Sequence, residues 1–98
     1  MPRSASYDDY LIESLKDHLL AKEYLKAALE DDDPRVFLLA LRNVAQANGV
    51  SKAAADSKLN RESLYRMLSG RGNPSLRSLG ALLRSLGFRL TVESRDAA

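Results

Sequence analysis

The stretch VSKAAADSKLNRESLYRMLSG, residues 50–70, decides the fold of this chain. Gly49 stands directly before it and is a typical residue for ending a helix. Ser51 and Asn60 are both good N-caps, so each is expected to open a new helix. The stretch therefore predicts two short helices joined by a tight turn, with the second helix beginning at Asn60.

The second of these helices has two unlike faces. At about 100° per residue, Leu64, Met67 and Leu68 fall on one side of it. The opposite side carries Glu62, Tyr65, Arg66 and Ser69, with Arg61 at the margin. Such a helix can bury one face against its own domain and lay the other in the major groove of DNA. A solvated amphipathic helix in a small bundle is the alternative, but the order of caps, turn and arginine-rich helix favours DNA binding.

The rest of the chain up to residue 86 is also predicted to be helical. The additional helices are expected at about residues 7–16, 17–31, 34–48 and 75–86. Asp17 can cap the second of them, and Asp33 followed by Pro34 is a strong start signal for the third. The predicted apolar sides are Tyr10, Leu11 and Leu15; Leu20, Tyr24, Ala27 and Ala28; Phe37, Leu38, Leu41, Val44 and Ala45; and Leu76, Leu79, Leu82, Leu83 and Leu86. The expected fold is all-α, with five to six short helices.

Residues 88–93 break this pattern, because Phe88, Leu90 and Val92 alternate with polar residues as in a β-strand. A lone strand needs a ladder partner, and no second strand is evident in the sequence. The partner is expected to be the same strand of a second copy or the edge of another protein's sheet; an exposed extended tail is the alternative. Phe88, Leu90 and Val92 are the predicted dimerisation residues.

Length and composition set the outer bounds. Ninety-eight residues make one domain, here divided into an acidic helical segment (1–33) packed on the core, a helical core (34–87), and a C-terminal strand with a frayed tail (88–98). The chain has no cysteine, which excludes disulfides and suits a reducing cytoplasm. No signal peptide or membrane span is predicted, because the apolar runs are short.

The net charge of +2 hides a strong asymmetry. Residues 1–33 carry four basic and nine acidic side chains, whereas residues 34–98 carry eleven basic and four acidic ones. The basic part suits the neutralisation of phosphates, and the acidic part would repel DNA or attract a basic protein. The alternative is a soluble surface with unevenly distributed charge. Together with the two-helix motif, the asymmetry favours two different partners.

The motifs NRESLYRMLSGRGNP (residues 60–74) and YLKAALEDDDP (residues 24–34) resemble the addiction-module antidote proteins. These are small HigA-type antitoxins with an Xre-like, lambda-repressor-like helix-turn-helix. The resemblance covers most of the chain. It implies that the protein pairs with a small RelE-like toxin, blocks it in a complex, and binds the operator of its own operon.

Two positions depart from the family pattern. Lys58 stands where the family usually has glycine in the turn, and a left-handed lysine there would cost about 1 kcal/mol. Asn60 replaces the usual serine or threonine that opens the recognition helix, and it should cap equally well. We therefore expect the turn to form in spite of both changes.

The predicted DNA contacts come from both helices of the motif and from the loop that follows. Arg61, Glu62 and Arg66 are expected at base edges, since arginine can pair with guanine and glutamate can accept from cytosine or orient an arginine. A structural role for Glu62 is the alternative. The other candidates are Ser51, Lys52, Arg71 and Asn73 for phosphate, Tyr65 for phosphate or a thymine methyl, and Ser63 for a contact or for the helix cap.

The expected docking surface for a basic RelE/HigB-like toxin lies on the acidic first third. Its residues are Glu13, Leu20, Glu23, Tyr24, Ala28 and Glu30. We also expect a homodimer that binds an inverted repeat, with no membrane partner, no cofactor and no metal. Asp31 to Asp33 lie between a helix end and a helix cap, which argues against a metal site there.

Enzymatic activity is not expected. The chain has a single histidine, His18, and no cysteine. A nucleophile–base pair of the usual type is therefore not expected. Residues 70–74 also lack the Gly-Lys-Ser/Thr ending of a phosphate-binding loop. The alternatives to an antitoxin are a stand-alone or phage-type repressor and a protein-interaction module with a degenerate helix-turn-helix.

Overall fold

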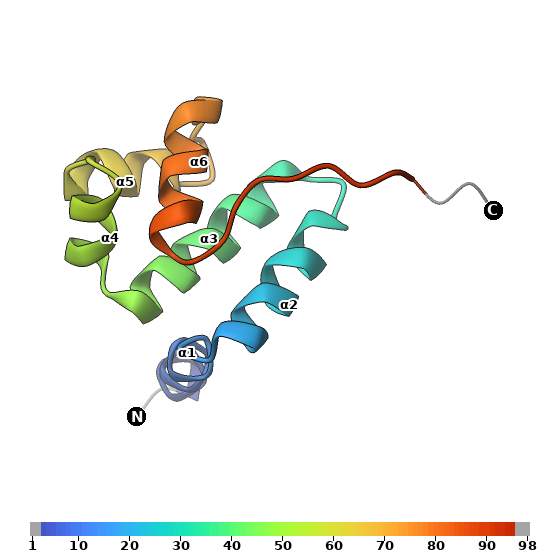
Figure 1. Cartoon of the computed structure of the whole chain (residues 1–98). Helices are drawn as coiled ribbons and strands as arrows, with labels where there is room; N and C mark the ends of the chain where they lie inside the picture. Colours follow the sequence, from blue (N-terminus) through green and yellow to red (C-terminus); the bar gives the residue numbers. More distant parts are fainter. Residues whose placement is uncertain (1–2, 96–98) are drawn as a thin grey trace.

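The computed structural model describes residues 3–95, with side chains from residue 7 onward. This part of the chain forms six helices (Figure 1). They are α1 (Arg3–Ser14), α2 (His18–Leu29), α3 (Pro34–Asn48), α4 (Val50–Asp56), α5 (Arg61–Met67) and α6 (Leu76–Ser85). The predicted all-helical class and the approximate position of each helix are confirmed.

Short polar side chains set the beginnings of three helices. Asp17, Asp33 and Ser75 each accept a hydrogen bond from a backbone N–H in the first turn of α2, α3 and α6. Such caps satisfy donors that have no partner inside the helix. Asp17 and Asp33 thus cap their helices as the sequence predicts, and Ser75 caps α6 in the same way.

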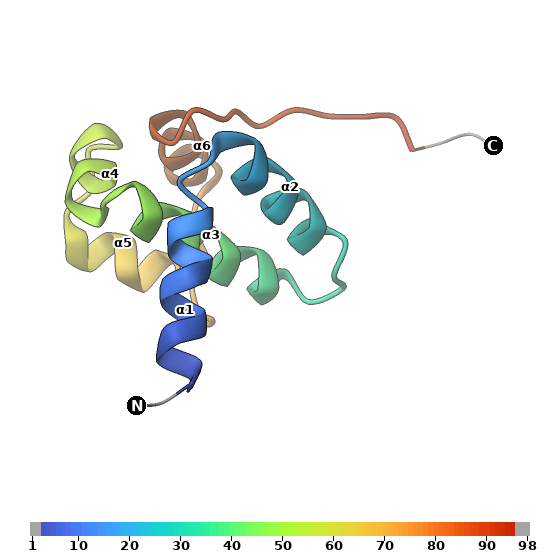
Figure 2. The same cartoon turned by 90° about the horizontal axis from the view of Figure 1, so that it is seen from below.

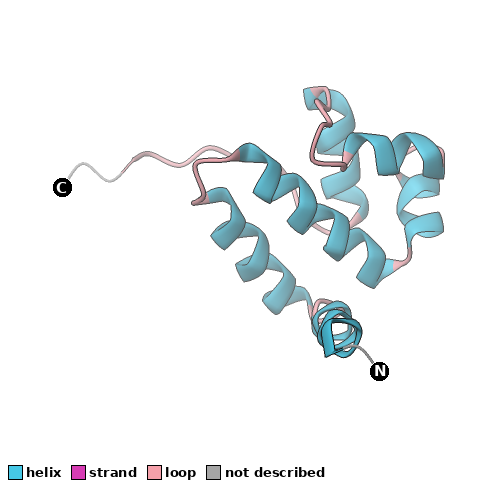
Figure 3. Cartoon of the chain, turned by 180° about the vertical axis from the view of Figure 1, so that it is seen from behind, coloured by secondary structure: helices cyan, strands magenta, loops and turns pink. Residues whose placement is uncertain are grey.

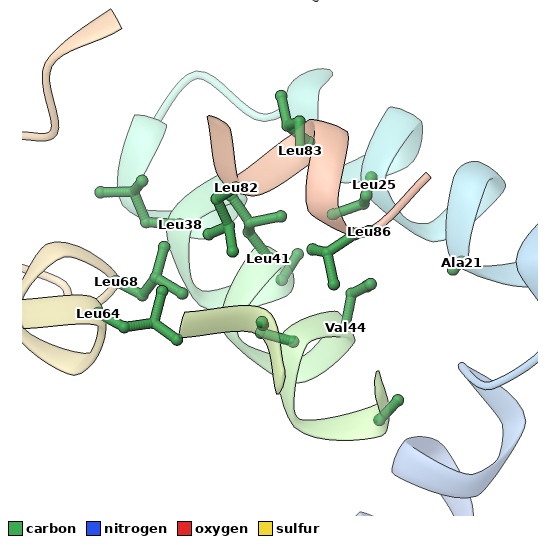
Figure 4. Packing of buried hydrophobic residues seen from close by; sticks show 14 of the residues in the cluster. Ala21, Leu25, Leu38, Leu41, Val44, Leu64, Leu68, Leu82, Leu83 and Leu86 are labelled. Atoms are coloured by element: carbon green, nitrogen blue, oxygen red, sulfur yellow. The ribbon is translucent and has the colours of Figure 1, made fainter. Parts of the chain in front are cut away.

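Helix α3 is the centre of the molecule and packs against α1, α2 and α4. The largest fully buried side chains are Leu41, Val44, Leu64, Leu68 and Leu82. They come from α3, the end of α5 and α6, and Figure 4 shows them converging in one apolar cluster. Each such leucine contributes about 1.5–3 kcal/mol through burial. This core holds α4 and α5 in place relative to α3.

Helices α1 and α2 bury less of their apolar surface than the sequence predicts. Ala21 and Leu25 are the buried residues of α2, whereas Leu20 is 52% exposed. On α1, Tyr10 is 72% exposed, while Leu15 just beyond the helix is buried. The predicted apolar side of α1 is thus only partly buried, because α1 contacts α3 along one side and extends away from the bundle (Figure 2). Leu20 is exposed, as its place in the predicted docking surface requires.

The predicted β-strand at residues 88–93 is also wrong. Among residues 3–95 the structure has helices and loops but no strand (Figure 3). Alternation alone does not make a strand when no neighbouring strand supplies a ladder. Instead, the Phe88 ring stacks on His18 with the ring centroids 4.4 Å apart, and Val92 is 93% exposed. Beyond Phe88, the chain continues without regular structure and leaves the bundle (Figure 1).

Candidate nucleic-acid interface

Helices α4 and α5 are anchored by their apolar sides. Ala53 and Ala54 of α4 are buried, as are Leu64 and Met67 of α5 and Leu68 at its end. The predicted inward face of α5 is thus confirmed. Because that face is held by the core, the opposite face of α5 is fixed in orientation and open to a ligand.

The turn between α4 and α5 places one residue in an unusual backbone conformation. Lys58 has φ of +62°, the left-handed region that favours glycine. The surrounding bonds hold it there: the Ser57 hydroxyl donates to the Ala53 carbonyl at 2.6 Å, and the Leu59 N–H donates to the Ala54 carbonyl at 2.8 Å. The turn therefore forms in spite of the lysine, at a local cost of about 1 kcal/mol.

The two predicted caps of this segment behave differently. Asn60 accepts the backbone N–H of Ser63 through Oδ1 at 2.6 Å, so Asn60 caps α5 as expected. Ser51 is not a cap. Helix α4 follows Gly49, which has φ of +93° and no side chain to offer, so Ser51 already lies in the first turn. Ser51 is nevertheless exposed to solvent at the start of α4.

The predicted base-reading residues lie on the open side of α5. Arg61, Glu62 and Arg66 are all exposed, and none of them takes part in an ion pair within residues 7–95. Their charged groups are thus available to a partner. Ser63 is half-buried, and its backbone N–H is the group that completes the cap.

Four of the predicted contacts line one shallow groove beside α5. Ser63, Arg66, Arg71 and Asn73 surround a hollow of about 600 Å³ between α5, the following loop and α6. The loop is fixed partly by Ser69, whose hydroxyl donates to the Arg66 carbonyl at 3.0 Å. Two arginines on one side of an open groove favour an anionic ligand such as a phosphate backbone.

Lys52 is held by a neighbour on its own helix. Its ammonium group lies 2.7 Å from a carboxylate oxygen of Asp56, one turn along α4. The pair is exposed to solvent, and exposed pairs of this kind are weak. A phosphate can therefore compete for Lys52 at little cost.

Tyr65 is placed differently from the other residues of the predicted interface. It is half-buried, and the Arg42 guanidinium of α3 lies over its ring at 5.5 Å from the centroid. This contact ties the outer part of α5 to α3. Arg42 is a residue that reasoning from the sequence missed. No local signal identifies it, since it comes near α5 only through the packing of α3.

The predicted toxin-binding residues do not form one continuous surface. Glu13, Glu23 and Glu30 are exposed, and Leu20 is largely so. Tyr24 and Ala28 are half-buried and belong to the side of α2 that packs on the core. The Tyr24 hydroxyl accepts a hydrogen bond from Asn43 of α3 at 2.8 Å.

Acidic residues also cluster at the corner between α2 and α3. The Arg35 guanidinium donates to both carboxylate oxygens of Asp33, which lowers the pKa of Asp33 from 3.8 to about 2. Asp31 and Asp32, beside it, are exposed and make no ion pair within the described side chains. The corner therefore keeps a local excess of negative charge.

No group of three or more histidine, cysteine, aspartate or glutamate side chains among the described residues is arranged to hold a metal ion. None of the helices in the same part of the chain is both long and apolar enough to cross a membrane.

Comparison with known proteins adds a family match. Residues 6–94 match the model of a family described as "probable addiction module antidote protein". A Haemophilus influenzae protein described as uncharacterized is 34% identical over 92 residues, which cover 85% of this chain and 95% of that protein. No solved structure matches significantly.

Proposed function

We infer that the chain, which belongs to the family of probable addiction module antidote proteins, serves as the antitoxin of a toxin–antitoxin pair. It neutralises a RelE/HigB-like toxin by direct binding, as a HigA-type antitoxin would. It also represses its own operon through an Xre-like helix-turn-helix formed by α4, the turn at Ser57–Asn60, and α5.

The observation that carries the DNA-binding proposal is the exposed, unpaired arginine face of a firmly anchored α5. Arg61 and Arg66 project from a helix whose other side is buried in the core. A recognition helix needs this combination, because the buried face fixes the angle at which the open face enters the major groove. Arg71 and Asn73 lie beside it in the same groove as Arg66, in a position suited to phosphate contacts.

Charge supports a separate docking site for the toxin. The first 33 residues have an excess of five acidic side chains, and Glu13, Glu23 and Glu30 are exposed. A toxin that acts on RNA needs a basic surface to hold phosphates, and such a surface is complementary to α1 and α2. In this proposal Leu20, which is exposed next to these acids, contributes the apolar contact.

A homodimer on an inverted repeat completes the proposal. One α5 contacts only a few base pairs, whereas a two-fold pair can place two recognition helices about 34 Å apart, one turn of DNA. We place the chain in the cytoplasm and assign it no enzymatic activity. A stand-alone repressor without a toxin partner remains the second candidate, favoured by the arginine face of α5 alone.

Operator binding by point variants tests the DNA-binding part. Arg61→Ala and Arg66→Ala should each cost about 1–3 kcal/mol and relax the preference at particular base pairs. Lys52→Ala should instead weaken binding to all sequences alike and reduce the salt slope by about one unit. Fluorescence anisotropy with operator and scrambled duplexes at several salt concentrations measures both effects.

Glu13→Gln is the matched control, since it changes a charge on α1 and should leave the operator affinity unchanged. If Arg61→Ala, Arg66→Ala and Lys52→Ala all lost affinity uniformly for every sequence, the assignment of the base-reading face would be wrong.

A further inference from the structure

The segment after α6 ends in an arm whose outer part, beyond Leu90, is left uncovered by its own chain. We define the arm as residues 89–95. Leu90 touches the body, with its Cδ1 3.6 Å from the position that a Cβ on Gly80 would take. Beyond it the arm extends away from the helices (Figures 1 and 2), and Val92 is 93% exposed. Covering such an exposed apolar side chain with a partner lowers the free energy, because its surface is removed from water.

The same chain carries an apolar groove that none of its arm residues line. This α2–α3 groove has a volume of about 370 Å³ and lies between the end of α2, the start of α3 and the loop before α6. The apolar residues that line it include Leu29, Phe37, Leu38, Pro74 and Leu79. Leu29 is 62% exposed, so the groove offers apolar surface to an incoming side chain.

The charges of the arm and the groove are complementary. Asp31 and Asp32 line the groove, and neither is paired with a cation among the described side chains. Arg35 also lines it, but its guanidinium is occupied by Asp33. The arm carries Arg89 and Arg95 against one acid, Glu93, and none of the three is paired in the described structure, so the arm keeps a small excess of positive charge.

From this match we propose that two copies of the chain exchange their arms. Val92 of one copy lies in the α2–α3 groove of the other, and the arm arginines approach Asp31 and Asp32. The contact is reciprocal, so a two-fold axis doubles every interaction and closes the assembly. This inference rests on the homodimer of the proposed function. It assigns the dimer surface to the arm and the α2–α3 groove instead of to a paired β-strand.

Arm exchange also links dimerisation to the proposed DNA interface. The α2–α3 groove is lined by Gly72, Asn73 and Pro74, and the groove beside α5 is lined by the same three residues. An arm docked on one side of this loop supports Asn73 and its neighbour Arg71 on the other. Dimerisation therefore adds a packing contact to the loop that is expected to hold the phosphate backbone.

The test measures the dimer dissociation constant of the full chain by sedimentation, without DNA or toxin. Val92→Asp and Leu29→Lys change exposed residues, so the fold should be retained, and circular dichroism checks this. Each should raise the dissociation constant at least about tenfold, since every dimer loses two apolar contacts. The matched controls are Thr91→Asn, which changes the neighbouring arm residue without adding a charge, and Leu19→Lys, which changes an exposed leucine at the other end of α2; both should leave the dissociation constant nearly unchanged.

Mixing the two variants gives a sharper result. A heterodimer of the Val92→Asp chain with the Leu29→Lys chain has one intact arm in one intact groove, and the introduced aspartate and lysine meet at the other. Native mass spectrometry should therefore show more heterodimer than either homodimer. If the full chain is a dimer that neither variant weakens, arm exchange is wrong and the homodimer stands. If the full chain is a monomer at tens of micromolar, the homodimer itself fails, and arm exchange fails with it.

Discussion

Lys58, in the turn between α4 and α5, has a strained backbone conformation. Its φ of +62° is costly for any side chain with a Cβ, and the exposed Lys58 side chain forms no ion pair among the described residues. We expect Lys58→Gly to raise the free energy of unfolding by up to about 1 kcal/mol. Chemical denaturation of both proteins measures the difference.

Lys58→Ala is the control for this prediction. It removes the same charge but keeps the Cβ, so it should bring no comparable gain. Equal stabilisation by glycine and alanine would show that the charge of Lys58, and not its backbone conformation, is unfavourable.

Asp33 makes the stability depend on pH. Its pKa is about 2 in the folded chain, below the ordinary value of 3.8, because Arg35 donates to its carboxylate through side chain and backbone. A lowered pKa means that the ionised group stabilises the fold above about pH 4, and that this contribution is lost as the pH falls through 2.

The Asp33→Asn variant isolates this effect, since asparagine also caps a helix but does not titrate in this range. The wild type should be the more stable protein at pH 5, and the difference should shrink steadily toward pH 2. Thermal unfolding across this range measures it. A difference that stays constant from pH 5 to pH 2 would contradict the assigned ion pair.

Among the elements, the loop between α5 and α6 depends on the close approach of Gly72 to the Met67 carbonyl group. A Cβ on Gly72 would lie 1.9 Å from the Met67 carbonyl oxygen, which no real structure accommodates. Gly70, two residues earlier, has nothing nearer than an Arg35 side-chain carbon at 4.0 Å. The loop that carries Arg71 and Asn73 can therefore close only with glycine at position 72.

Gly72→Ala should destabilise the protein by about 1–3 kcal/mol, because the loop must move away from Met67. It should also weaken operator binding, since Arg71 and Asn73 move with the loop. Gly70→Ala is the matched control and should change little. Thermal unfolding and anisotropy test the pair, and equal tolerance of both substitutions would contradict the tight closure.

Local signals in the sequence predict most of the helices. Asp17, Asp33 and Ser75 act on backbone groups two or three residues away, so their roles can be recognised without a structure. The prediction for Ser51 is wrong because the chain enters α4 two residues earlier, after Gly49 and with no side-chain cap. The strand at residues 88–93 was wrong for a different reason: alternation describes one chain, whereas a strand needs a second one.

The candidate site was also predictable in part, where local sequence patterns determine it. The outward face of α5 follows from helical phase, so Arg61 and Arg66 were placed correctly on it. Contacts between elements that are far apart in the sequence cannot be recognised from local patterns. The position of Arg42 over Tyr65 and the bond from Asn43 to Tyr24 depend on how α3 packs, and only the structure reveals them.

At the scale of the whole molecule, the charges separate two surfaces. The arginine face lies on α5 and the loop after it, and the exposed acids lie on α1 and α2, across the central helix α3 (Figure 1). Opposite charges on different helices allow one chain to hold DNA and a basic protein without competition for the same residues. We therefore assign toxin neutralisation and operator binding to these separate surfaces.

The most direct test measures both activities on the same variants. Growth rescue of cells expressing the toxin reports neutralisation, and a gel shift on the operator reports DNA binding. The combined charge reversal of Glu13, Glu23 and Glu30 to lysine should abolish rescue and leave the gel shift nearly intact. The Arg61→Ala/Arg66→Ala double variant should lose the gel shift and still rescue growth. If rescue and operator binding fell together in both variants, the two-surface account would be contradicted.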